Sequence, residues 1–289
     1  MKLQEKGTVE EITLHATTLG RDKTIWVYLP YDYANAAKHY PVIYMHDGQH
    51  VFNRADSPKH DWFLEDKLNV LHSEAIIVGI EHGGSTHRLD ELTPYKNEKH
   101  GGGHADDYLD FLVNELKPYV DGHYKTLTDA PNTTIFGSSV GGLISFYALL
   151  KFPDVYGNAG VFSPSFWYSE EIFELIKSVD SISGRIYLMA GDHESKDMVP
   201  DLERMEKLIL ERIAKPTQLH KKIVAGGHHN EKLWRHEFAD AYKWLIGVYI
   251  LSEDERKAIA EAKNDIASGN TISNEDVNHF FDKWLKNES

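Results

Sequence analysis

The stretch from Thr133 to Leu150 constrains the fold of this chain more than any other. It begins with a short β-branched and aromatic run, continues as Gly137-Ser138-Ser139-Val140-Gly141, and ends in an apolar stretch with helical spacing. The central residues fit the pattern G-x-S-x-G, so the stretch predicts a strand, a sharp turn and a helix. Ser139 is then expected on a strained turn with its hydroxyl exposed, because the flanking glycines let strand and helix pass closely.

The pattern alone also fits an ordinary glycine-rich turn, in which the serine is simply buried. A nucleophilic serine needs a histidine as base, and that histidine needs a carboxylate to fix its tautomer. In α/β-hydrolases these groups follow the serine in the order acid, then histidine. The rest of the chain therefore decides between the two interpretations.

Segments with strand and helix character alternate along most of the chain. Glu10–Leu19 and Lys23–Leu29 alternate polar and apolar residues and predict two antiparallel strands. Further strands are expected at 40–45, 75–80, 158–164, 185–191 and 219–226, and further helices at 61–73, 106–120, 197–213 and 230–251. This order predicts an α/β fold with a mostly parallel central sheet and helices on both faces. We assign residues 1–251 to one α/β-hydrolase domain.

Residues 252–289 have a different character. Ser252-Glu253-Asp254-Glu255 begins one predicted helix, and Ser273-Asn274-Glu275-Asp276 caps a second that carries Phe280 and Trp284. A helical hairpin of this size cannot bury its own apolar face. We therefore expect a C-terminal helical appendage that packs on the body of the chain or joins two chains as a homodimer.

Composition excludes several function classes. The formal net charge of -14 argues against nucleic acid and anionic membranes as partners. The chain has no cysteine, which rules out disulfides, thiolate metal sites and a cysteine nucleophile. No apolar run reaches the length of about 18 residues that spans a membrane, and no signal peptide is visible, so we expect a cytoplasmic protein. The 17 histidines include no His-Glu-x-x-His motif, so no metal or other cofactor is expected.

Two strand ends after Ser139 carry an acid and a histidine. Gly191-Asp192-His193-Glu194 follows one strand, and Gly226-Gly227-His228-His229-Asn230 follows the next. Parallel strands bring their carboxyl ends to one edge of the sheet, so these groups are expected beside Ser139. The carboxylates that compete for the acid are those of Asp192, Glu194 and Asp197, the last better suited to cap the following helix. Residue chemistry alone does not choose between His228 and His229 as the base.

An earlier strand end offers a further group. The run at 40–45 ends in His46-Asp47-Gly48-Gln49-His50. In α/β-hydrolases the loop at this place supplies one backbone N–H of the oxyanion hole, and the Gln49 N–H is our candidate. Gly48 permits the tight turn; the alternative is an Asp-Gly turn without chemistry. The polar and glycine-rich segment 81–103 is expected to be a long loop.

Taken together, these segments make the sequence similar to the putative-esterase family of α/β-hydrolases. That family includes esterase D, enterochelin-type siderophore esterases and feruloyl esterases. The resemblance spans roughly residues 8–250 and does not extend to residues 252–289. The matching segments are Tyr40–Gln49, Glu91–Tyr95, Phe136–Gly142, Ser163–Trp167 and Gly227–Arg235.

The resemblance implies roles that residue chemistry leaves open. The family base stands five residues before the tryptophan of the last helix, which gives His229. The family acid stands three residues after the strand-ending glycine, which gives Glu194. The oxyanion donors are implied to be the N–H groups of Val140 and Gln49. Trp167 matches an aromatic residue near the substrate, and we expect the site to include Phe166, Gly48 and Arg88 as well.

We therefore expect a serine carboxylesterase that acts on a small-molecule ester through an acyl-enzyme. The aromatic patch at 165–168 favours feruloyl or acetyl esters of carbohydrates. A siderophore trilactone is the alternative substrate, for which Arg88 and Arg235 are the nearby cations. A non-catalytic binding module with the same fold is the alternative from a different class.

Overall fold

The computed structural model describes residues 6–52 and 61–247, together with residues 261, 264–265 and 268. The chain divides into two compact units, Met1–Val248 and Tyr249–Ser289. The first unit contains the fold and the site described below. The predicted C-terminal helical appendage and its role in a homodimer fall almost wholly outside the described residues.

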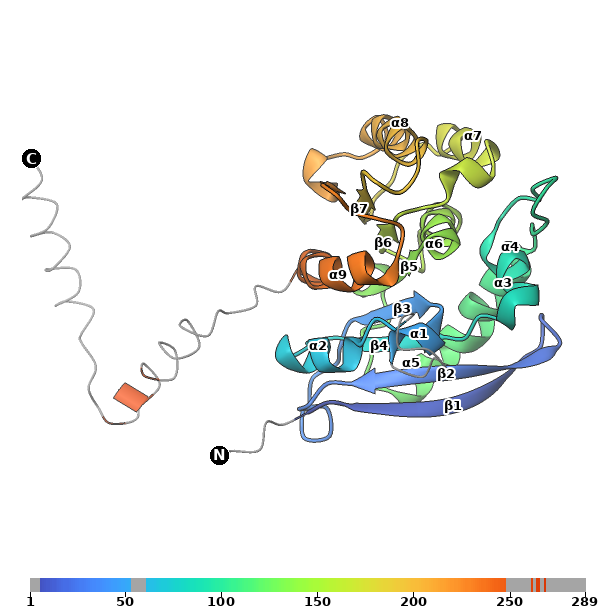
Figure 1. Ribbon diagram of the computed structural model, residues 1–289. Coiled ribbons are helices and arrows are strands. Elements are labelled where there is room, and N and C mark those ends of the chain that lie inside the picture. The colour runs from blue at the N-terminus through green and yellow to red at the C-terminus, as the bar shows by residue number, and fades with distance from the viewer. Residues whose placement is uncertain (1–5, 53–60, 248–260, 262–263, 266–267, 269–289) are drawn as a thin grey trace, which may run out of the picture. The chain divides into compact units, whose positions relative to one another are not determined.

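An eight-stranded sheet runs through the described part of the first unit (Figure 1). Its strands are β1 (Thr8–Ala16), β2 (Arg21–Leu29), β3 (Val42–His46), β4 (Ile76–Ile80), β5 (Thr133–Ser138), β6 (Asn158–Phe162), β7 (Arg185–Gly191) and β8 (Leu219–Val224), in the spatial order β1-β2-β4-β3-β5-β6-β7-β8. β2 pairs antiparallel with both β1 and β4, and all other neighbours are parallel. The predicted mostly parallel sheet is confirmed.

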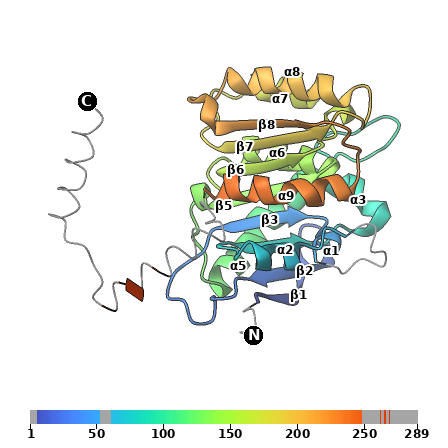
Figure 2. The same ribbon diagram turned by 60° about the vertical axis from the view of Figure 1, so that its left-hand side comes forward.

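Helices cover both faces of this sheet. They are α1 (Gly48–Val51), α2 (Leu64–Val70), α3 (Gly84–Leu92), α4 (Ala105–Phe111), α5 (Lys117–His123), α6 (Val140–Lys151), α7 (Glu171–Lys177), α8 (Met198–Leu210) and α9 (Glu231–Ile246). In Figures 1 and 2, α2 and α9 lie over one face and α6 lies on the other. No helix of the described residues is long and apolar enough to cross a membrane.

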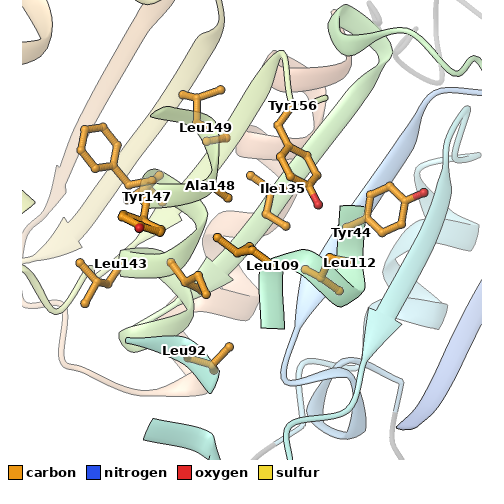
Figure 3. Close-up of a cluster of buried hydrophobic side chains, with 14 of the residues drawn as sticks. Tyr44, Leu92, Leu109, Leu112, Ile135, Leu143, Tyr147, Ala148, Leu149 and Tyr156 are labelled. Atoms are coloured by element: carbon orange, nitrogen blue, oxygen red, sulfur yellow. The ribbon is translucent and has the colours of Figure 1, made fainter. Parts of the chain in front are cut away.

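The central strands and α6 form the core that positions the site. Every residue of β3, β4 and β5 is buried, as expected for parallel strands covered on both faces. Figure 3 shows side chains from β3, β5 and α6 meeting in one cluster, among them Tyr44, Ile135, Leu143 and Ala148. Burial of a large apolar side chain contributes about 1.5–3 kcal/mol, so this cluster holds the start of α6 firmly against the sheet.

One element contradicts the expectation of a long loop at 81–103. Helix α3 occupies Gly84–Leu92 of that segment. Its sequence is polar, so hydrophobic periodicity does not reveal it. An ion pair ties the helix to the sheet instead, because Glu91 Oε1 lies 2.6 Å from Lys23 Nζ and both side chains are 1% exposed. The helix is thus specified by a contact between residues far apart in the sequence.

Candidate active site

Ser139 lies on a sharp turn between β5 and α6. Its backbone angles, φ 60° and ψ -124°, are strained for a residue other than glycine. The Ser139 N–H donates to Phe162 O at 3.0 Å, and its carbonyl accepts from the N–H of Ser165 at 3.1 Å. A Cβ on Gly137 would lie 2.6 Å from the Gly141 backbone, so only glycine lets the strand and helix approach this closely. The strand, turn and helix lie where the sequence predicts them.

Ser139, His229 and Glu194 form one hydrogen-bonded line. Ser139 Oγ is 3.0 Å from His229 Nε2, and His229 Nδ1 is 2.6 Å from Glu194 Oε2. Glu194 follows β7 and His229 follows β8, so adjacent parallel strands deliver both groups to the same edge. Asn230 caps α9 by accepting the Leu233 N–H at 3.1 Å, which fixes the backbone directly after His229.

The Glu194 carboxylate is buried, with a side chain that is 1% exposed. Its Oε1 accepts two further hydrogen bonds, from the Gly191 N–H at 2.6 Å and from Ser163 Oγ at 2.7 Å. The other carboxylate oxygen, Oε2, is hydrogen-bonded to His229.

The competing residues face other partners. Asp192 is exposed and accepts from the Gly226 N–H at 2.7 Å. His228 is also exposed, and its Nδ1 lies 3.1 Å from His193 O. Asp197 occupies the position before α8, but its side chain makes no capping hydrogen bond. The geometry therefore joins Ser139 to Glu194 and His229 rather than to these alternatives.

The expected oxyanion donors both lie in first turns of helices. Val140 is the first residue of α6 and Gln49 is the second residue of α1. N–H groups in a first helical turn have no acceptor within the helix. Gly48 lies directly on β4, because a Cβ there would be 2.5 Å from the Gly79 carbonyl carbon. The Gln49 side chain accepts from the His82 N–H at 3.3 Å and holds the same loop to the end of β4.

An ion pair that the sequence did not reveal anchors this loop. Asp47 has left-handed backbone angles, φ 58° and ψ 42°, and both of its carboxylate oxygens accept from Arg88 at 2.8 Å. Burial alone would raise the pKa of Asp47, but the Arg88 guanidinium lowers it to about 2. Arg88, expected to contact substrate, is thus engaged by the protein itself.

His46 lies at the end of β3, beneath the turn. It is 3% exposed, and its Nδ1 is 2.9 Å from the Tyr108 hydroxyl. Burial lowers the pKa of His46 to about 4, so the ring is neutral at physiological pH.

Within the described part of the chain, no three histidine or carboxylate side chains gather as ligands of a metal ion would.

The aromatic patch divides into a buried and an exposed residue. Phe166 is 1% exposed and packs on Phe146 and Phe173, so its ring lies in the core and its expected contact with substrate stays a prediction. Trp167 is 49% exposed and lies edge-on to the His100 ring at 5.6 Å between centroids. The two aromatics follow Ser165, whose Oγ is 3.4 Å from Ser139 Oγ. Trp167 therefore remains the aromatic candidate for substrate contact.

Three neighbours of the site were missed in the sequence, namely Asp47, Ser163 and Ser165. All three follow the ends of buried strands, which is the signal that could have pointed to them. The segment around His100 belongs to the predicted loop 81–103. It is tied to the aromatic patch, because Asn97 Nδ2 donates to Tyr168 O at 2.7 Å.

A family model described as "Putative esterase" matches residues 16–245. The chain belongs to this family. The match covers most of the chain, and it confirms the predicted family and the prediction of an ester hydrolase. It also sets aside the alternative of a non-catalytic binding module.

The esterase has relatives of low identity. It is 26% identical to the uncharacterized Bacillus subtilis protein YbbA over 235 residues, which cover 76% of this chain and 91% of YbbA. It is 27% identical to an endo-1,4-beta-xylanase/feruloyl esterase of Xylanibacter ruminicola over 196 residues, 66% of this chain and 26% of that protein. The solved structure of the Shigella flexneri enterobactin esterase FES in the presence of enterobactin matches 83% of this chain and 58% of that one. The two structures align with a TM-score of 0.67 at 22% identity. The α/β-hydrolase fold is confirmed.

Proposed function

We propose that the esterase hydrolyses carboxylic esters through an acyl-enzyme, with Ser139 as nucleophile, His229 as base and Glu194 as the orienting acid. The observation that carries the proposal is the unbroken line of hydrogen bonds from Ser139 Oγ through His229 to a buried carboxylate. A serine hydroxyl is a weak nucleophile at neutral pH, and a hydrogen-bonded imidazole removes its proton as it attacks. The line of hydrogen bonds gives each group a place in that step.

The reaction follows from this geometry. Ser139 Oγ attacks the ester carbonyl while His229 Nε2 takes its proton. The Val140 and Gln49 N–H groups stabilise the oxyanion, at about 3 kcal/mol per donor in comparable enzymes. The imidazolium then protonates the leaving alcohol, and a water molecule activated by the same imidazole releases the acid.

For the substrate we propose a feruloyl or acetyl ester of a carbohydrate. Ser165 lies beside the proposed nucleophile, and Trp167 follows it by two residues. The exposed ring of Trp167 offers a stacking surface for an aromatic acyl group or a sugar. The name of the Xylanibacter relative points in the same direction.

A siderophore trilactone is the second candidate, favoured by the likeness to the enterobactin esterase structure. A catecholate substrate would need cations at the site. Arg88 is held by Asp47, and the Arg235 guanidinium lies over the Phe63 ring and donates to Asp61 O at 3.2 Å. These engagements favour the first candidate.

The test is a panel of methyl ferulate, acetylated xylan, p-nitrophenyl acetate and a catecholate trilactone. We expect Ser139→Ala to lower kcat by about 1,000-fold or more on every ester that the wild type hydrolyses. Ser145→Ala is the matched control, because Ser145 is buried in the same helix and bonds only to Gly141 O. Wild-type hydrolysis by a folded Ser139→Ala protein would contradict the proposal.

A further inference from the structure

The hydrogen bonds at Glu194 continue past the three proposed reacting residues, to Ser163 and Trp234. Trp234 Nε1 donates to Ser163 Oγ at 2.7 Å, and Ser163 Oγ donates to Glu194 Oε1 at 2.7 Å. Ser163 is 0% exposed and Trp234 is 6% exposed, so water does not compete for these bonds. Ser163 follows β6, whereas Trp234 lies on α9, five residues after His229.

The chemistry of the indole gives this chain of hydrogen bonds a direction. The Trp234 Nε1–H can only donate, so Ser163 Oγ accepts from it. The one proton of the Ser163 hydroxyl is then directed to Glu194. An ionised carboxylate can only accept, so the bond between Glu194 Oε2 and His229 Nδ1 requires a proton on Nδ1. A neutral imidazole with its proton on Nδ1 presents a bare Nε2, which faces Ser139 Oγ at 3.0 Å.

We propose that Ser163 and Trp234 are positioning residues that fix the tautomer of His229. The proposal rests on the proposed function of His229 for its effect on catalysis. The tautomer itself is a property of the resting protein and is measured without substrate. Trp234 thus orients the Ser163 hydroxyl, Ser163 orients the Glu194 carboxylate, and that carboxylate keeps the proton of His229 on Nδ1.

Backbone strain at Ser163 supports this role. Its φ of 42° lies in the left-handed region, which residues other than glycine rarely adopt. The Ser163 N–H donates to Met189 O at 2.6 Å, which holds the residue in that conformation. The strained backbone places Oγ between the indole of Trp234 and the carboxylate of Glu194, two groups brought by different elements.

The Trp234 ring has a second, separable effect. It lies edge-on to the His229 imidazole, with centroids 5.0 Å apart and an interplanar angle of 88°. This contact limits rotation of the imidazole whether or not the indole donates a hydrogen bond. Trp234→Phe keeps an aromatic ring at this place and removes the N–H, so it isolates the hydrogen bond.

The chain offers a matched control pair at the opposite end of the sheet. Ser73 is a buried serine whose Oγ lies 2.9 Å from the hydroxyl of Tyr242, another aromatic residue of α9. Ser73 precedes β4, whereas Ser163 follows β6, so the control pair is remote from Ser139. Ser73→Ala and Tyr242→Phe remove the same kinds of group without touching the site.

The experiment is a histidine-selective ¹⁵N and ¹H NMR measurement of the resting protein, paired with kinetics on p-nitrophenyl acetate. The wild type is expected to show His229 with its proton on Nδ1 and a downfield imidazole proton. Trp234→Phe and Ser163→Ala are expected to weaken that signal and mix the two tautomers. Loss of such supporting partners lowers kcat by about 10-fold to 100-fold, with KM changed little, and Ser163→Ala should have the larger effect. The Ser73 and Tyr242 variants should leave both readouts unchanged.

The proposal is overturned if both variants keep a single Nδ1–H tautomer and the wild-type kcat, or if wild-type His229 carries its proton on Nε2. Should Ser163→Ala fail to fold, Trp234→Phe decides alone, because it keeps an aromatic ring at this place. If Ser139→Ala retains activity while the NMR signal responds as expected, the proposed nucleophile is wrong and the tautomer control stands.

Discussion

Two groups of residues belong to the proposed site around Ser139, and they are held in different ways. The acid–histidine side consists of Glu194, His229, Ser163 and Trp234, and it is joined by a chain of hydrogen bonds. The oxyanion side consists of Asp47, Gly48, Gln49 and Arg88, and it is held by an ion pair and by close backbone packing. Hydrogen bonds have a direction and so control where a proton lies. The hydrogen-bonded ion pair of Arg88 with Asp47 and the close packing of Gly48 hold the backbone in place and lead no proton to His229.

The difference suggests what each side contributes. On the acid–histidine side, loss of one donor loosens the carboxylate that keeps the proton of His229 on Nδ1 and so slows proton transfer. On the oxyanion side, a disturbance displaces an N–H group by a fraction of an ångström and weakens a stabilising contact. Variants on the two sides are therefore expected to differ both in the size of the loss they cause and in whether they change proton transfer or the position of the loop.

The largest effect is expected for Glu194→Gln. An amide can turn its NH₂ group toward His229, which favours the tautomer with the proton on Nε2. The equivalent change in another serine hydrolase lowers kcat by about 10⁴-fold while geometry is kept, and we expect a loss of this order. Steady-state kinetics on p-nitrophenyl acetate measures it. Asp192→Asn is the control and should stay within about 2-fold of wild type, because Asp192 is exposed and bonds only to Gly226. A larger loss in the control than in Glu194→Gln would move the acid to Asp192.

Gly48→Ala tests the oxyanion side through packing. The added methyl would lie 2.5 Å from the Gly79 carbonyl carbon, so the loop that carries Gln49 must shift. Loss of one oxyanion donor lowers kcat by about 100-fold to 1,000-fold, and we expect a result near the lower limit with KM little changed. Gly122→Ala is the control, because nothing lies within 4 Å of its added methyl. Wild-type kcat in Gly48→Ala would remove Gln49 from the proposed oxyanion hole.

Arg88→Met tests the ion pair. It leaves the Asp47 carboxylate, which is 12% exposed, without its partner, and breaking a largely buried pair destabilises a protein by about 3 kcal/mol. Denaturant unfolding measures this loss, and the double variant Asp47→Asn, Arg88→Met should recover part of it. Lys38→Met is the comparison, since its ion pair with Glu74 is exposed and contributes less than about 1 kcal/mol. Equal losses of stability in Arg88→Met and Lys38→Met would show that the Asp47–Arg88 pair stabilises the protein no more than an exposed pair does.

The smallest effect, on stability at low pH, is expected at His46, the last residue of β3. Its pKa is about 4 in the folded protein, against 6.5 ordinarily, because burial disfavours the charged ring. The unfolded chain therefore binds a proton below pH 6.5 that the folded protein does not, and stability falls as the pH is lowered from 6.5 toward 4. The loss from this residue reaches about 2 kcal/mol by pH 5. His46→Asn should flatten the decline in Tm over that range. An unchanged slope in His46→Asn would contradict this account.

The two sides also differ in how far the sequence predicts them. In the sequence, apolar runs that end in glycine or a small polar residue mark the carboxyl ends of β3, β7 and β8. Gln49, Glu194 and His229 follow these ends, so their approximate places could be predicted. The partner of Asp47 was not predictable, because Arg88 lies on a polar helix that only a tertiary ion pair reveals.

Residue chemistry alone also could not decide between neighbouring residues of similar type. Asp192 and Glu194 are equivalent carboxylates in the sequence, and the folded structure distinguishes them by the burial of the Glu194 side chain and by its hydrogen bond to His229. Phe166 and Trp167 are adjacent aromatics on a 3₁₀ turn, which sends the first into the core and the second into solvent. Family resemblance singled out Glu194 and His229 as the proposed acid and base, but it gave no sign that Phe166 is buried.

The central claim is that Ser139 is the nucleophile of this esterase. Its most direct test is treatment with a fluorophosphonate, followed by peptide mass spectrometry and an assay of the remaining activity. We predict one adduct, on Ser139, with loss of activity in proportion to labelling and no labelling of Ser139→Ala. An adduct on Ser138 or Ser165, or full activity in a protein labelled at Ser139, would contradict the claim.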